Sequence, residues 1–185
     1  MTPGDDGPEP SPAAAASTLD AARVARWLGE LGVVPAEHAE REGVHSWDLL
    51  LDGRRRRRVR ITLILAPDVG IVAWVHYAPQ LSDGFRRGYR QLLRWNDQLL
   101  FARFALAHDE RIVLSAELPP ELAERDRLGR LLARLLAVCD ALLDASTRWL
   151  WPGGRPPASE GEADPFLLER FPEAGTDLEL EAADR

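Results

Sequence analysis

The spacing of apolar residues along the chain predicts three amphipathic helices. In the first, they recur at i, i+3, i+4 and i+7: Val24, Trp27, Leu28 and Leu31. This helix should be capped by Ser17 or Thr18 and should end at Gly32. A second helix is predicted over residues 82–96, where one face is shared by Phe85, Tyr89, Leu92, Leu93 and Asn96. A third is predicted from residue 120 to about 149, with leucines along one face.

Runs rich in Val, Ile and aromatic residues predict five strands. They cover residues 47–51, 59–65, 70–77, 99–106 and 112–118. The connections between consecutive strands are short and contain turn sequences, so the sheet should be mainly antiparallel. The order αβββαββα therefore predicts an α+β fold with a five-stranded sheet.

The alternation of apolar residues also predicts the register of the first hairpin. A two-residue turn at Asp52-Gly53 would point the apolar residues of its two strands to opposite faces. A loop with an odd number of residues, for example three with a bulge at Gly53, brings both sets to one face: Trp47, Leu49 and Leu51 with Val59, Ile61 and Leu63. We predict the odd loop.

Composition divides the chain into a domain and two tails. Residues 1–17 are acidic and rich in proline and alanine, and residues 152–185 are acidic and rich in proline and glycine. We expect both to be flexible around a domain of residues 18–151. An apolar island at residues 164–171 either docks back on the domain or is an accidental cluster. The net charge is −7, but the expected domain carries 20 arginines against 18 acidic residues.

Several kinds of chemistry are excluded by composition. All 23 basic residues are arginine, which leaves no lysine for a Schiff base or a Walker-type phosphate loop. The single cysteine, Cys139, lies on the leucine-rich helical face and should be a small buried hydrophobe. The four histidines lack metal-ligand spacing, and no serine occupies a nucleophile context. We expect no enzymatic activity, no cofactor and no metal.

The chain also lacks signals for a membrane. No apolar run approaches the roughly 18 residues that span a bilayer. The N-terminus is acidic where a signal peptide would be basic. We therefore expect a cytoplasmic protein.

Six of the seven residues from 54 to 60 are arginine. In the odd-loop register, alternate members form a stripe on the face away from the core: Arg54, Arg56, Arg58 and Arg60. Three interpretations are open: a solvated edge strand, a docking surface for an acidic peptide or for the chain's own C-terminal segment, and a nucleic-acid site. The negative net charge and the lack of a nucleic-acid-binding motif argue against the last.

The chain contains six tryptophans, which are further candidates for partner binding. Trp27 and Trp47 fit core positions. The strand around Trp74 is apolar on both faces, so it needs a second cover from a helix, a second subunit or a bound peptide. Trp95 lies off the expected buried arc of its helix. We predict that Trp27, Trp74, Trp95 and the arginine stripe contact a partner.

The stretch from residue 92 to 121 resembles the YbjN family, in which an Asn-containing turn, an aromatic strand, an acidic hairpin and an AELP sequence follow one another. The matching residues here are Leu92, Leu93, Asn96, Leu99, Phe101, Ala102, Phe104, Leu106, Asp109, Ile112, Val113, Leu114, Glu117, Leu118 and Pro119. The resemblance implies a type III secretion chaperone-like fold that often dimerises. It also implies a bacterial sensory regulator or a peptide-binding chaperone, and it supplies no catalytic residues.

These features together predict a non-enzymatic module that holds a client protein segment on a sheet and helix surface and forms a homodimer. A structural homodimer in a regulatory assembly is the first alternative, and a nucleic-acid-binding protein that uses the arginine run is the second. The acidic C-terminal segment is a candidate pseudo-client that screens the arginine stripe.

Overall fold

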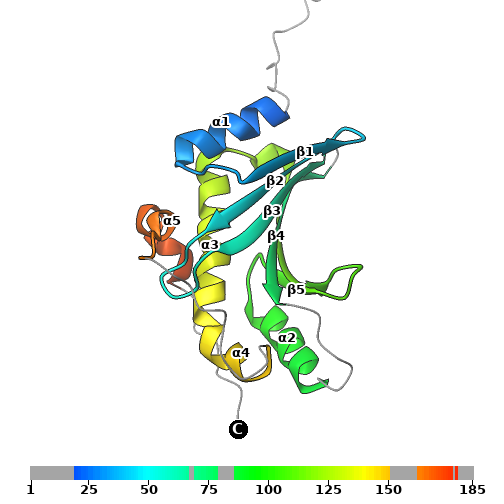
Figure 1. Cartoon of the computed structure of the whole chain (residues 1–185), viewed down its shortest axis with the longest axis vertical. Coiled ribbons are helices and arrows are strands. Elements are labelled where there is room, and N and C mark those ends of the chain that lie inside the picture. Colours follow the sequence, from blue (N-terminus) through cyan, green and yellow to red (C-terminus); the bar gives the residue numbers. More distant parts are fainter. Residues whose placement is uncertain (1–18, 67–68, 79–85, 151–161, 177, 179–185) are drawn as a thin grey trace, which may run out of the picture.

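A six-stranded antiparallel sheet with helices packed on one face forms the body of the computed structural model (Figure 1). The structure describes residues 19–66, 69–78, 86–150, 162–176 and 178. The strands follow the order β1-β2-β3-β4-β6-β5. They are β1 (Glu37–Arg41), β2 (Val44–Leu51), β3 (Val59–Ala66), β4 (Gly70–Ala78), β5 (Arg103–Leu106) and β6 (Ile112–Leu118). The helices are α1 (Ala21–Leu31), α2 (Arg86–Gln98), η1 (Pro120–Leu122), α3 (Arg125–Ala141), α4 (Leu143–Leu150), α5 (Phe166–Arg170) and η3 (Pro172–Gly175).

The α+β class is confirmed, but the sheet has one strand more than the five we predicted. The additional strand is β1, whose five residues are all exposed and carry no apolar alternation. It forms because Glu42 and Gly43 both adopt positive φ, at 52° and 79°, as a two-residue type I′ hairpin turn requires. β1 is therefore a strand because it pairs with β2, and its burial pattern does not indicate a strand.

The register of the β2–β3 hairpin agrees with the parity prediction. Leu51 pairs with Val59 and Leu49 with Ile61, so the apolar residues of both strands share one face. The loop between them has an odd length, as expected, although it spans residues 52–58 and not three residues. Burial of one face is the reason that only an odd loop fits.

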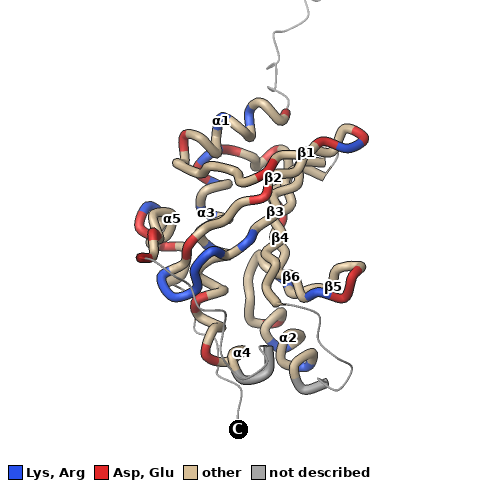
Figure 2. The backbone as a smooth tube through the Cα atoms, viewed as in Figure 1, with Lys and Arg blue, Asp and Glu red and all other residues tan. Residues whose placement is uncertain are grey.

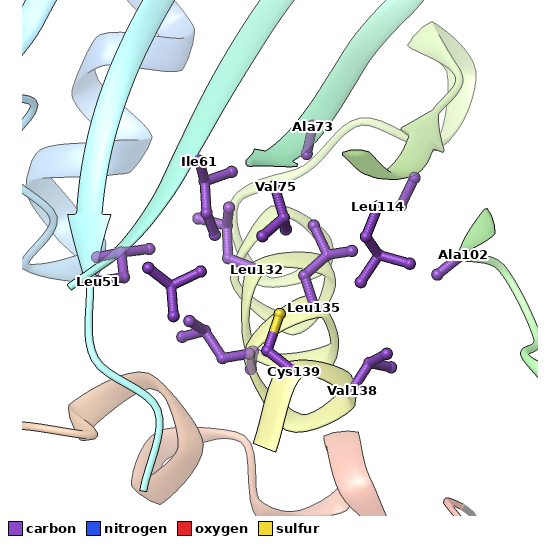
Figure 3. Packing of buried hydrophobic residues seen from close by; sticks show 14 of the residues in the cluster. Leu51, Ile61, Ala73, Val75, Ala102, Leu114, Leu132, Leu135, Val138 and Cys139 are labelled. Carbon is purple, nitrogen blue, oxygen red and sulfur yellow. The ribbon is translucent and has the colours of Figure 1, made fainter. Parts of the chain in front are cut away.

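The core lies between this sheet face and α3 (Figure 3). Leu132, Leu135 and Cys139 of α3 point at Ile61 and Val75 of the central strands, and all five side chains are fully buried. α1 packs beside α3 and adds Trp27, among other residues, to the same core. The opposite face of the sheet carries polar and apolar side chains that are mostly half-buried or exposed.

Three predicted element boundaries need correction. Ser17 and Thr18 lie outside the described residues, and the cap of α1 is Asp20, whose carboxylate accepts the Arg23 N–H at 2.8 Å. The predicted strand at residues 99–106 is only β5, because Leu99 still continues the helical hydrogen bonding of α2. The long C-terminal helix is divided into η1, α3 and α4, with an interruption at Leu142.

Part of the expected C-terminal tail is folded. α5 and η3 pack on the side of α3 and bury four side chains there: Leu167, Leu168, Phe171 and Ala174. Glu173 pairs with Arg130 at 3.1 Å, and Arg134 donates to the Ala174 carbonyl at 3.0 Å. The expectation of a flexible tail is therefore wrong for residues 162–176, where the apolar island docks back. The expected tails at 1–17, 152–161 and 179–185 lie outside the described residues.

Gly129 of α3 makes this docking sterically possible. A Cβ at Gly129 would lie 2.4 Å from Phe171 Cε2 and 2.9 Å from Leu31 Cδ2. An alanine in a helix interior is normally more favourable than glycine by up to about 1 kcal/mol. At Gly129 the steric overlap should make alanine less favourable than glycine.

We predict that Gly129→Ala destabilises the protein and loosens α5, because the new methyl group collides with the Phe171 ring. Hydrogen exchange across residues 166–175 should become faster, and the urea midpoint should fall. In the Phe171→Ala background, Gly129→Ala should lower the free energy of unfolding by a smaller amount, because the ring nearest to the new methyl group is absent. An equal effect of Gly129→Ala in both backgrounds would contradict this account.

Candidate functional site

The open face of the sheet carries Trp74 at its centre. Trp74 lies on β4, opposite Thr62 of β3 and Ser115 of β6, and its side chain is 39% exposed. Two further apolar residues on this face, Val44 and Leu50, are exposed to a similar extent. The predicted second cover over this face is not supplied by α1 or α3, which pack on the other side. Among the predicted tryptophan positions, Trp74 remains accessible to a partner.

Beside Trp74, a polar network crosses three strands of the same face. Arg60 of β3 forms an ion pair with Asp48 of β2, and Thr62 donates to the other Asp48 oxygen at 2.6 Å. The Thr62 hydroxyl also lies 2.8 Å from His76 Nε2 on β4. Burial opposes ionisation of Asp48, but the Thr62 and Arg60 contacts outweigh it and hold the pKa of this carboxyl below 3.8.

Hydrogen bonding in this network selects one form of the His76 ring. The single Thr62 hydroxyl proton goes to the ionised Asp48, so the Thr62 oxygen accepts a proton from His76 Nε2–H. The other ring nitrogen, Nδ1, is buried without a hydrogen-bond partner among the described residues. Burial, followed by the positive charges of Arg60 and Arg111, lowers the pKa of His76 below 6.5. The ring is therefore held neutral, with its proton on Nε2.

Residues 52–58, which we call the arginine loop, are organised around a carboxylate from α3. Asp140 is almost completely buried and accepts the backbone N–H groups of Arg54, Arg55 and Arg56 at 2.6, 3.1 and 2.7 Å. Successive N–H groups that converge in this way form an anion-binding nest. A Cβ at Gly53 would lie 2.5 Å from Asp140 Oδ1, so the close approach requires glycine.

This loop replaces the arginine stripe that the sequence predicted, because only Arg60 lies in a strand. Arg54 lines a cavity of about 360 Å³ beside α3 and the C-terminal segment, and Arg58 is exposed with a φ of 48°. Arg56 turns inward, with its guanidinium 4.6 Å above the Tyr77 ring and bonded to the Tyr77 carbonyl. Figure 2 shows the run as one continuous basic loop that lies beside α5 and not along a strand.

Two of the predicted partner-binding tryptophans belong to the core. Trp27 is only 6% exposed, and Trp95 is completely buried, with its ring centre 5.9 Å from that of Phe104. The prediction that Trp95 lies off the buried arc of α2 is therefore wrong. A tryptophan ring buries more apolar area than leucine, and the helix is rotated so that Trp95 points inward while Leu93 remains exposed.

That rotation opens an apolar groove between α2 and β5. The groove has a volume of about 410 Å³ and is lined by Tyr89, Leu92, Leu93, Asn96, Phe104, Ala105 and Leu106. Leu93 and Leu106, one from each wall, are 68% and 53% exposed. The turn between the two elements also exposes Leu100 and Phe101, the latter by 90% and at a φ of 63°. An exposed ring on a strained backbone is a common feature of binding sites.

Asn96 ties the two walls together. Its amide nitrogen donates to the Phe104 carbonyl at 3.0 Å, and its amide oxygen accepts the Phe104 N–H at 2.6 Å. The Asn96 side chain thus satisfies the backbone N–H and carbonyl of Phe104 at the outer edge of β5, and the groove surface stays apolar. The sequence placed Tyr89, Leu92, Leu93 and Asn96 on one helical face, but it did not show that this face lines a groove and not the core.

The described residues show no second arrangement with evident chemistry. Burial raises the pKa of the Cys139 thiol to about 11, so the thiol stays protonated and unreactive. Within the described ranges, no cluster of His, Cys, Asp or Glu side chains is arranged to hold a metal ion. In the same ranges, no helix combines the length and apolar character needed to cross a membrane.

Comparison with models of protein families matches residues 20–147 to YbjN, described as "Putative bacterial sensory transduction regulator". The match includes α1, the whole sheet, α2 and α3, and it ends before α5. The groove and the polar network therefore lie within the matched region, and the docked C-terminal segment lies outside it. No curated protein and no solved structure matches the chain.

We predict that Asp140→Asn lowers the free energy of unfolding by about 1 to 3 kcal/mol, because the amide cannot accept all three buried N–H groups. Asp144 provides the control. Its carboxylate pairs with Arg55 at 2.6 Å, but it is exposed, so Asp144→Asn should cost about 0 to 1 kcal/mol. Urea unfolding of both variants would measure the difference. Equal losses would show that the nest contributes little.

A second prediction concerns pH. Because the folded-state pKa of His76 lies below 6.5, the unfolded chain binds the proton first, and stability falls as the pH drops through 6.5 towards the folded-state pKa. Asp48 does not contribute in this window, since its pKa lies below 3.8. In His76→Gln the amide keeps a donor to Thr62 and does not titrate. Its stability should fall less than that of the wild type between about pH 7.5 and about pH 5.5. If the free energy of unfolding falls equally in the wild type and in His76→Gln over this range, the pH dependence does not come from His76.

Proposed function

Because this chain belongs to the YbjN family, we propose that it is a non-enzymatic regulatory protein that binds a segment of a partner protein. The binding surface in this proposal is the groove between α2 and β5. The exposure of Leu93 and Leu106 on facing walls is the observation that carries the proposal. Contiguous apolar surface rimmed by polar residues is typical of protein interaction sites.

The groove suits a peptide better than the open sheet face does. Its lining is almost entirely apolar, and it lies at the sheet edge, where a segment has access from outside. The open face around Trp74 is crossed by the Arg60–Asp48–Thr62–His76 network, whose polar groups are already paired with one another, apart from His76 Nδ1. A partner on that face would have to cover this network at a desolvation cost.

A structural homodimer is the second candidate function, and the same exposed leucines favour it. In that case the groove of one copy would be covered by another copy and would not be available to a client. Nucleic-acid binding through the arginine run is not proposed, because the run folds into a loop and Arg60 already has an acidic partner.

The test is a selection of random peptides on the full-length protein. Enriched peptides should bind the wild type and should lose about tenfold or more in affinity for the double variant Leu93→Ser/Leu106→Ser, because both apolar walls are removed. Leu122→Ser is the matched control, since Leu122 is an exposed leucine on η1 and does not line the groove. Fluorescence anisotropy gives the affinities.

Two results would overturn the proposal. One is the absence of enriched peptides. The other is a set of peptides that bind the groove variant as well as the wild type and lose affinity for Trp74→Ala, which would place the site on the open face.

A further inference from the structure

The α2 side of the groove between α2 and β5 is basic, although the whole chain is acidic. α2 and β5 together contain five arginines and one carboxylate, Asp97. Of these arginines, Arg90, Arg94 and Arg103 are exposed, and no carboxylate of the described residues pairs with them. Elsewhere on the surface several arginines pair with carboxylates, as Arg60, Arg111 and Arg130 show.

Two of these arginines flank the α2 wall of the groove. Arg90 and Arg94 each follow a lining residue, Tyr89 and Leu93, so they stand on the exposed flank of α2. Arg103 of β5 pairs with Ser115, the neighbour of Trp74, so it lies on the open sheet face and not on the wall formed by Phe104. Asp97 lies on the α2 flank and offsets only part of this charge. In the β5–β6 turn, the Asp109 carboxylate is already paired with Arg111 at 2.5 Å.

We propose that the groove takes an acidic amphipathic segment of a partner protein, with leucine or phenylalanine side chains in the groove and Asp or Glu side chains on the arginine rim. This inference rests on the proposed function and names its partner class. Arginine forks bind carboxylates in two-point geometry, and charges at a rim mainly set selectivity and the rate of association. The apolar walls supply most of the affinity, and the rim selects the charge of the segment.

The charge also argues against a second copy of the chain as the occupant. Two copies that meet through this groove across a twofold axis would bring their arginine rims together. Like charges facing each other in an interface are unfavourable, and a single Asp97 per copy cannot balance them.

The experiment uses three synthetic peptides of about 12 residues with identical leucine and phenylalanine positions and with Glu, Gln or Lys at every polar position. Binding to the full-length protein is measured by fluorescence anisotropy at low and high salt. We expect the Glu peptide to bind about tenfold more tightly than the Gln peptide at low salt, with a smaller ratio at high salt. In Arg90→Glu/Arg94→Glu the preference should change to the Lys peptide. The control is Arg26→Glu/Arg41→Glu, which makes the same change in net charge on α1 and β1. This variant should still bind the Glu peptide more tightly than the Gln peptide, as the wild type does.

The outcomes separate this inference from the proposed function. If the three peptides bind the wild type equally at both salt concentrations, or if the Lys peptide binds best, the acidic assignment is wrong and the groove remains a peptide site. If none of the three peptides binds, both proposals fail. If sedimentation shows a dimer that Leu93→Ser/Leu106→Ser dissociates and that competes with the peptides, the occupant is a second copy.

Discussion

The contact between Asp140 and the arginine loop ties the sheet to the helical layer. A buried carboxylate is tolerated only when its oxygens receive hydrogen bonds, and here three consecutive backbone N–H groups supply them. Gly53 allows the approach because any Cβ at that position would overlap the carboxylate. The end of the β2–β3 hairpin is thereby fixed on α3, and both sides of the core keep their relative position.

This constraint also distributes the positive charge of the molecule. Once the loop is bound to Asp140, its side chains diverge. Arg56 covers the Tyr77 ring, and Arg55 pairs with Asp144 on α4. Part of the most arginine-rich segment therefore has a structural role. Arg90 and Arg94, which flank the apolar groove on α2, have no acidic partner among the described residues, and this charge favours an acidic segment at the proposed binding site.

The two faces of the sheet and the C-terminal segment limit where a partner can bind. One sheet face is sealed by α1 and α3, and the other is crossed by the network that includes Asp48 and His76. α5 and η3, which lie beyond the family match, cover the side of α3 near Gly129. The groove between α2 and β5, lined by the exposed Leu93 and Leu106, is covered by none of these elements, and for this reason the proposed site lies there.

The sequence by itself determined the α+β class, the amphipathic helices α1, α2 and α3 and the hairpin register, because burial of one face fixes the period and parity of apolar residues. It could not reveal β1, whose five exposed residues become a strand only through pairing with β2. It also could not decide which side of α2 turns inward, since Trp95 and Leu93 are both apolar. Packing of Trp95 against Phe104 made that choice and left the groove open. Likewise, only the buried Asp140 shows why the arginine run is a loop. These features depend on contacts between residues far apart in the chain, and such contacts leave no periodic signal.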